Sequence, residues 1–206
     1  GMPGLLKAQE EHLRERFQKA KVELETRNAL LDPVGPRRSN SHAQCSFVWQ
    51  HVAEFDVVHT LEGDGIAVYD AQGRERQRIK GIEAMGADVR YGIQAANGAR
   101  IDIAAIALPD EDAIGFYRID PESSTPLTKR NQLSISMTPE GVCLGKNATT
   151  SALFVAAYDE EGTVKQYKLG FDGHQIQSII NNTDGPLPVR ITQVGGELSA
   201  CAIDDA

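Results

Sequence analysis

Four carboxylates in the second half of the chain could form one acidic cluster that holds a hard cation. They are Glu140, Glu197, Asp204 and Asp205. Carboxylate oxygens are the ligands that Ca²⁺ takes in proteins, so a cluster of these residues would bind the ion with modest affinity. The alternative is that they are ordinary exposed or turn carboxylates, and the sequence leaves both interpretations open.

Other motifs that carry chemistry are missing from the sequence. It contains no GxSxG turn, no glycine-rich P-loop and no HExxH helix, which mark serine hydrolases, P-loop proteins and zinc proteases. The five histidines are scattered without ligand spacing, so no metal site is expected from them.

The three cysteines, Cys45, Cys143 and Cys201, are an odd number without a CxxC pair. Each lies within an apolar run typical of a strand. We predict that they are buried free thiols, with a disulfide or a metal role as the alternative.

The chain of 206 residues is acidic, with a formal net charge of −8, and has 41% hydrophobic and 24% charged residues. This balance is typical of a soluble globular protein. The charge argues against non-specific nucleic-acid binding, which depends on Lys and Arg neutralising phosphates. No apolar run approaches the roughly 20 residues of a membrane-spanning helix. An acidic protein that handles a phosphate-rich ligand would need metal cations.

The segment 1–36 is predicted to hold an amphipathic helix in front of the main domain, 37–206. Apolar side chains recur at steps of three, four and seven residues, which places them on one helix face. They are Leu6, Leu13, Phe17, Ala20, Leu24 and Leu31. This stripe must be covered, either by its own domain or by a helix of a second chain.

A repeat with a period near 50 residues runs through the rest of the chain. Three versions of one apolar strand carry Tyr69, Tyr117 and Tyr167, which are 48 and 50 residues apart. Each version follows another apolar strand and precedes a turn and a weaker strand. Four strands in a period of this length are the signature of a β-propeller blade.

The first strand of each repeat is predicted as well. These strands are Cys45–Gln50, Ala87–Ile93, Gly141–Gly145 and Leu198–Ile203, the last in a unit that is cut short. First strands line the central channel of a propeller, so a ligand site is expected at their ends. The predicted fold class is all-β, a partial propeller of about three and a half four-stranded blades preceded by an N-terminal amphipathic α-helix.

Six short motifs in collinear order point to a known family. They are Gly65–Gly73, Ala87–Tyr91, Ile101–Ile106, Glu140–Leu144, Thr163–Leu169 and Ala200–Asp205. The region from Cys45 to Ala206 resembles the bacterial β-propeller phytases, and the helical segment lies outside the resemblance. The resemblance implies a propeller of the six-bladed type and calcium-dependent hydrolysis of phosphomonoesters such as phytate, an inositol phosphate.

The same resemblance assigns substrate binding to Arg90, which matches a phosphate-binding arginine of the family. A planar guanidinium can donate two parallel hydrogen bonds to a phosphate group. A solvent-exposed or salt-bridged arginine is the alternative. Asp88 and Tyr91 also match, and each is equally well explained as a residue that forms the blade.

Most other functional positions of the family are changed in this chain. Paired lysines are replaced by Glu62 and Gly63, and the position of a phosphate-binding lysine falls near Glu160. A tyrosine is replaced by Glu140 and a metal-binding glutamate by Ser199. The added carboxylates would make a phosphate pocket repel anions unless Ca²⁺ fills it.

We therefore expect a phytase-like domain that is a calcium-dependent phosphomonoesterase or an auxiliary domain of one, with a non-catalytic interaction module as the alternative. By resemblance the protein would be secreted or periplasmic, although the sequence carries no signal peptide. A partial propeller cannot close its circle, so we expect a homodimer or packing on a second propeller domain. Neither a nucleic acid nor a membrane is an expected partner.

Overall fold

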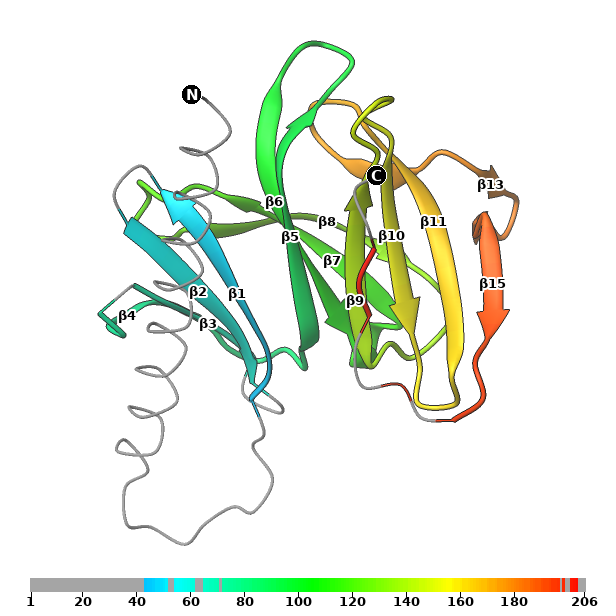
Figure 1. Ribbon diagram of the computed structural model, residues 1–206, viewed down its shortest axis with the longest axis horizontal. Coiled ribbons are helices and arrows are strands. Elements are labelled where there is room, and N and C mark those ends of the chain that lie inside the picture. Colours follow the sequence, from blue (N-terminus) through cyan, green and yellow to red (C-terminus); the bar gives the residue numbers. More distant parts are fainter. Residues whose placement is uncertain are drawn as a thin grey trace, which may run out of the picture.

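The chain folds as antiparallel sheets that follow one another in sequence (Figure 1). The computed structural model describes residues 43–51, 54–61, 65–70, 72–196, 198 and 201–203. The predicted helix and the predicted domain boundary after residue 36 lie outside these residues. Within the described part, no helix has the length and apolar character to cross a membrane.

Three main sheets are built from consecutive strands. The first consists of β1 (Ala43–His51), β2 (Glu54–Leu61), β3 (Gly65–Tyr69) and β4 (Glu75–Ile79). The second consists of β5 (Met85–Gln94), β6 (Arg100–Leu108), β7 (Ala113–Ile119) and β8 (Leu127–Ser134), with the short 3₁₀ helix η1 (Pro109–Glu111) between β6 and β7. The third contains β9 (Gly141–Lys146), β10 (Leu153–Tyr158), β11 (Thr163–Phe171) and β12 (Ile176–Ser178).

The third sheet carries an irregular outer edge. A small hairpin, β13 (Asn181–Asn182) and β14 (Gly185–Pro186), follows β12. The chain then returns as β15 (Arg190–Gln193), which pairs with β11 beside residues 163–166, whereas β12 pairs with residues 169–171. Two short strands thus share the outer edge of β11.

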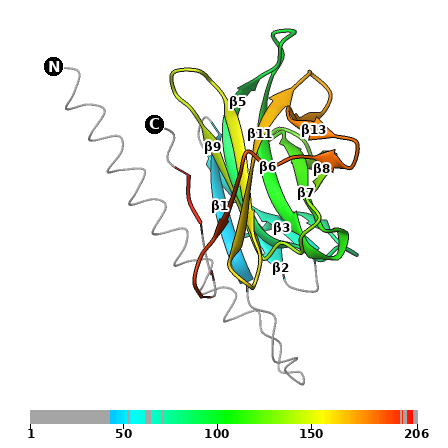
Figure 2. The same ribbon diagram turned by 90° about the vertical axis from the view of Figure 1, so that its right-hand side faces the viewer.

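The strand order is that of successive propeller blades. Each sheet runs from its first to its fourth strand in chain order, and β5 contacts both β1 and β9. The first strands therefore lie next to one another, as Figure 1 and Figure 2 show for β1, β5 and β9. The prediction of an all-β partial propeller is confirmed, and so are the first strands of the first three repeats.

The repeat tyrosines occupy equivalent positions. Tyr69, Tyr117 and Tyr167 are each the fifth residue of the third strand of their sheet, in β3, β7 and β11. Tyr117 packs into the apolar cluster between the first and second sheets, and Tyr167 into the cluster between the second and third. Each of these two rings thus faces the preceding sheet, which is the equivalence that the repeat predicts.

Apolar packing joins each sheet to the next. The cluster between the first and second sheets includes Val58, Ile66, Val68, Val89, Ile106, Leu108 and Leu127. The cluster between the second and third includes Ile103, Ile114, Phe116, Leu133, Leu144, Val155, Leu169 and Ile176. Because alternate residues of a strand point to opposite faces, the second sheet can supply side chains to both clusters.

Side-chain amides link the outer strands in a repeated way. Gln77 of β4 donates to the carbonyl of Leu127 at 2.8 Å and accepts from its N–H at 2.7 Å. Asn131 of β8 does the same to Ile176, at 2.6 and 2.9 Å. Each amide therefore saturates both backbone groups at the start of the next sheet's outer strand.

Gly86 lies where all three sheets meet. Its N–H donates to the hydroxyl of Thr60 in the first sheet, at 3.1 Å. A Cβ added to Gly86 would lie 3.3 Å from the Cα of Gly141 in the third sheet, and the φ of Gly86 is +70°. A left-handed backbone without a side chain is what this bulge in β5 requires.

The prediction of three free thiols is wrong for two of the cysteines. Cys143 and Cys201 form a disulfide, and the side chain of Cys45 lies outside the described residues. Cys201 is bonded to Cys143, and Ile203 lies against Gly145. Both pairs advance in the same order along the chain, so residues 201–203 run beside β9 and parallel to it. Parallel first strands of consecutive units bring equivalent residues together, which explains the pair. The described residues of the predicted strand Leu198–Ile203 form no β-ladder.

Candidate functional site

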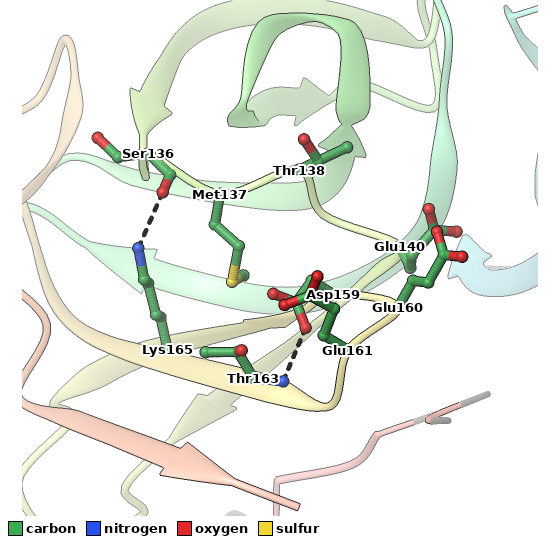
Figure 3. A pocket seen from close by; sticks show the side chains of 9 residues that line it. All are labelled: Ser136, Met137, Thr138, Glu140, Asp159, Glu160, Glu161, Thr163 and Lys165. Carbon is green, nitrogen blue, oxygen red and sulfur yellow. Dashed lines mark hydrogen bonds between the residues drawn. The ribbon is translucent and has the colours of Figure 1, made fainter. Parts of the chain in front are cut away.

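An acidic cavity of about 560 Å³ opens at the start of β9, beside the second and third sheets (Figure 3). It is lined by the loop that leads from β8 to β9, by the turn between β10 and β11, and by the beginning of β11. The lining residues are Ser136, Met137, Thr138, Glu140, Asp159, Glu160, Glu161, Thr163 and Lys165. A site at the end of a first strand is where the sequence predicts a ligand.

Glu140 is held at the mouth by the first residues of β9. Its backbone N–H donates to the carbonyl of Tyr158 at 2.8 Å. The next residue, Gly141, packs so closely on the ring of Tyr158 that an added Cβ would lie 2.3 Å from the hydroxyl oxygen. The glycine thus lets the tyrosine cover the strand while Glu140 remains half-buried at the edge of the cavity.

The other three carboxylates come from one tight turn. Asp159 accepts a hydrogen bond from the N–H of Thr163 at 2.7 Å, and its carbonyl accepts from the N–H of Gly162 at 3.3 Å. This capping fixes Asp159, whereas Glu160 and Glu161 at the tip of the turn are exposed. In Figure 3, Glu140 and Glu160 lie at one side of the cavity and Lys165 at the other.

The single ammonium group of the lining is already engaged. Lys165 donates to the carbonyls of Ile135 at 2.9 Å and Ser136 at 3.0 Å. It therefore ties β11 to the loop after β8 and has little capacity for an anionic ligand. Four carboxylates and one engaged ammonium make the potential of this cavity negative, which favours cations over phosphate esters.

The donors suit calcium in kind, since Ca²⁺ takes six to eight oxygen ligands. Among the described residues, however, no three or more His, Cys, Asp or Glu side chains lie close enough to hold one ion. Of the four predicted ligands, Glu140 lines the cavity, while Glu197, Asp204 and Asp205 lie outside the described residues. The predicted four-carboxylate cluster stays a prediction.

Arg90 does not line this cavity. Its side chain, 18% exposed, donates to Oδ1 of Asp88 at 3.0 Å and to the carbonyl of Val89 at 2.8 Å. It also donates to the carbonyls of Leu144 and Ile203. Leu144 is four residues along β9 from Glu140, a separation of roughly 13 Å in a strand. The structure therefore does not bring Arg90 and Glu140 together, and substrate binding by Arg90 remains a prediction.

Asp88 completes a clamp on one residue of the neighbouring sheet. Its Oδ2 accepts from the N–H of Leu144 at 2.8 Å, while Arg90 donates to the carbonyl of the same residue. Burial raises the pKa of the Asp88 carboxyl above its ordinary value, although the N–H of Leu144 and the Arg90 guanidinium oppose this. The Asp88–Arg90 clamp thus bridges β5 and β9, two first strands that share no ladder.

Sequence reasoning missed part of the site and the disulfide. Asp159, Glu161 and Lys165 line the cavity, but nothing in their local sequence marks them, because a β10–β11 turn is rich in polar residues in any case. The disulfide had a usable signal. Cys143 and Cys201 are 58 residues apart, close to one repeat, and each lies in a predicted first strand, Cys143 three residues after Glu140 and Cys201 four residues after Glu197.

A comparison with models of protein families shows which family the chain resembles. The family model described as Phytase matches residues 10–180, most of the chain. The chain belongs to the phytase family. The match begins at residue 10, inside the segment that the sequence motifs left outside the resemblance. No curated protein matches the chain.

Within the phytase family framework, the cavity contains two of the positions that the resemblance marks as changed. Glu140 stands where the resemblance implies a tyrosine, Glu160 lies near the position of a phosphate-binding lysine, and both line the same cavity. Glu62 and Ser199 lie outside the described residues. Two of the changed positions therefore line the same cavity, and both are acidic.

Solved structures include a remote likeness. The crystal structure of BBS1N in complex with ARL6DN, soaked with lead, matches with 11% sequence identity and a TM-score of 0.44. The match covers 74% of this chain and 43% of that chain, so this phytase-family chain spans less than half of the matched one.

Proposed function

We propose that this phytase-family chain binds calcium complexes of phosphomonoesters, of the inositol phosphate type, at the cavity beside Glu140. It acts either as a weak calcium-dependent phosphatase or as an auxiliary domain of one. The observation that supports this is the lining, in which Glu140, Asp159, Glu160 and Glu161 face a lysine that backbone carbonyls already occupy. Because no three of the described carboxylates lie close enough to hold one ion, a Ca²⁺ here would take the rest of its oxygen ligands from the ester and from water. The ion would cancel substrate charge and activate water.

Calcium binding tests the proposal directly. Calorimetric titration with CaCl₂ should show binding to the wild-type chain, and Glu140→Gln with Glu160→Gln should weaken it by at least about tenfold. Glu111→Gln, an exposed carboxylate outside the cavity, is the matched control. Equal affinities of the wild-type and doubly substituted chains would contradict the assignment of the ion to this cavity.

Phosphate release separates the two forms of the proposal. A weak phosphatase should release inorganic phosphate from phytate in the presence of CaCl₂ and stop when EDTA is added. We expect Glu140→Gln to abolish this activity, with circular dichroism as the check on folding. Arg90→Ala, at a residue that does not line the cavity, tests separately the substrate binding that the resemblance implies. An auxiliary domain should bind phytate only with calcium and release no phosphate.

The second candidate is a non-catalytic interaction module. Its support is a set of exposed apolar side chains on the rim of the third sheet, with Ile191 62% exposed. The others are Ile179, Ile180, Leu187, Val189 and Val194. Exposed apolar side chains gathered in one segment are typical of a surface that contacts another protein.

For that candidate we propose pairing with a second copy or with a second propeller domain. Light scattering at high micromolar concentration should then show a dimer of this chain, and Ile191→Glu should weaken it, whereas Thr192→Glu on the same strand is the control. A stable monomer would remove the homodimer. A location outside the cytoplasm is part of the proposal, since disulfides such as Cys143–Cys201 persist in oxidising compartments.

A further inference from the structure

The last described residues of the chain are fastened to the third sheet at three points. The disulfide joins Cys201 to Cys143 of β9. Ile203 lies over Gly145, where an added Cβ would come within 2.3 Å of its Cγ2 atom. The carbonyl of Ile203 accepts a hydrogen bond from the Arg90 guanidinium at 3.3 Å. One covalent bond therefore supports two weak contacts.

The two cysteines differ in exposure. Cys143 is 2% exposed, whereas the residue Cys201 is exposed. Thiol–disulfide exchange begins when a thiolate reaches one sulfur. Because Cys201 is the exposed residue of the pair, a reductant from solution is expected to approach the bond from its side.

Arg90 connects this bond to the interior of the propeller. Its guanidinium donates both to the carbonyl of Leu144 in β9 and to that of Ile203 in the fastened segment. Loss of residues 201–203 from their place would remove one of these acceptors. The guanidinium would then keep its bonds to the second sheet and to Leu144 while gaining donor capacity on the side that the segment leaves.

We propose that the Cys143–Cys201 disulfide is a redox-cleavable clasp that holds residues 201–203 on the third sheet and keeps Arg90 bonded to them. The reductant is a dithiol present in the compartment that holds the protein. One of its thiolates attacks the sulfur of Cys201 and Cys143 leaves as a thiolate. The second thiol of the reductant then displaces Cys201. The reductant becomes a disulfide, and both cysteines become thiols after the transfer of two electrons.

Arginine modification measures the clasp without reference to catalysis. The oxidised chain, and the same chain reduced with dithiothreitol and freed of it, are treated with phenylglyoxal, and modification of Arg90 is followed by peptide mass spectrometry. Reduction should make Arg90 react about tenfold faster, the size expected for loss of a hydrogen bond to a charged donor. Rates that agree within about twofold would overturn the proposal, and a larger rise supports it.

Variants separate the clasp from general loosening. The Cys201→Ser variant changes an exposed residue. In this variant Arg90 should react fast with phenylglyoxal whether or not reductant is present. Cys45→Ser should still respond to reductant as the wild-type chain does. Arg118, an exposed arginine of the second sheet, should react equally fast in all forms. A wild-type chain without a peptide linked through Cys143 and Cys201, or a Cys201→Ser chain that reacts as slowly as the oxidised form, would overturn the proposal. These readouts do not depend on calcium or phosphate binding, so they stand or fall separately from the proposed function.

Discussion

Asp88 shows how much of the inter-sheet order rests on single polar side chains. It accepts from the N–H of Leu144 and from Arg90, and its carboxyl is buried. Asp88→Ala should lower the free energy of unfolding by roughly 3 kcal/mol, because a buried N–H loses its acceptor and a part-buried guanidinium loses its counter-ion. Urea unfolding followed by tryptophan fluorescence measures the loss. Asp184→Ala, in an exposed turn, is the control, and equal losses in the two variants would contradict the clamp.

Gly145 is required for the seating of Ile203. A methyl group at this position would meet Cγ2 of Ile203 at 2.3 Å and its Cβ at 2.9 Å. Gly145→Ala should therefore cost about 1–3 kcal/mol, the usual range for an overpacked site. The control is Gly195→Ala, because nothing lies within 4 Å of the added methyl group there. Thermal unfolding of both variants gives the comparison, and an unchanged midpoint in Gly145→Ala would count against this seating.

At the scale of elements, the side-chain amides on the outer strands stabilise the contact between neighbouring sheets. Asn131→Ala removes both hydrogen bonds to Ile176 and should cost about 2 kcal/mol. The neighbouring Gln132 is exposed and points to the other face of β8, so Gln132→Ala should change stability little. Urea titration of the two variants tests the difference, which should vanish if the amide link contributes nothing.

The elements show why the sheets were predictable and the site was not. Tyr69, Tyr117 and Tyr167 recur at a regular spacing because each fills the same place in its sheet. The packing therefore produces a period that can be detected in the sequence. The acidic cavity joins Glu140 to Asp159 through two segments that touch only after the sheet has formed. The pairing of Cys143 with Cys201 likewise depends on the parallel course of two first strands, which strand patterns in the sequence do not reveal.

At the scale of the whole molecule, we expect the folded protein to lose stability in alkaline solution because two of its tyrosines are buried. Burial raises the pKa of Tyr117, which is 2% exposed, from 10.0 to about 12, with the Glu111 carboxylate adding to the effect. Burial also raises the pKa of Tyr167, 1% exposed, to about 12. The folded state therefore holds these protons more tightly than the unfolded state does.

The sign of this effect follows from linkage. Stability from the two tyrosines is complete below pH 10 and is lost as the pH rises towards 12, by up to about 3 kcal/mol for each ring. Urea unfolding between these pH values measures the decline. The double variant Tyr117→Phe with Tyr167→Phe should decline less steeply, whereas Tyr91→Phe, at an exposed position, should follow the wild type. Parallel curves for all three would contradict the prediction.

Two of the hydrogen-bonded contacts between the second and third sheets lie far apart, Asp88 with Leu144 on the first strands and Asn131 with Ile176 on the outer strands. Apolar contacts hold the two sheets together, but they discriminate weakly between alternative alignments of one sheet on the other. A small shift of one sheet replaces one methyl contact by another. A directional bond fails when its partner shifts by a single residue. Apolar side chains therefore hold the sheets together, whereas polar side chains fix how the sheets are aligned. A variant that lacks the polar contacts could keep most of its resistance to denaturant and still lose the unique alignment of its sheets.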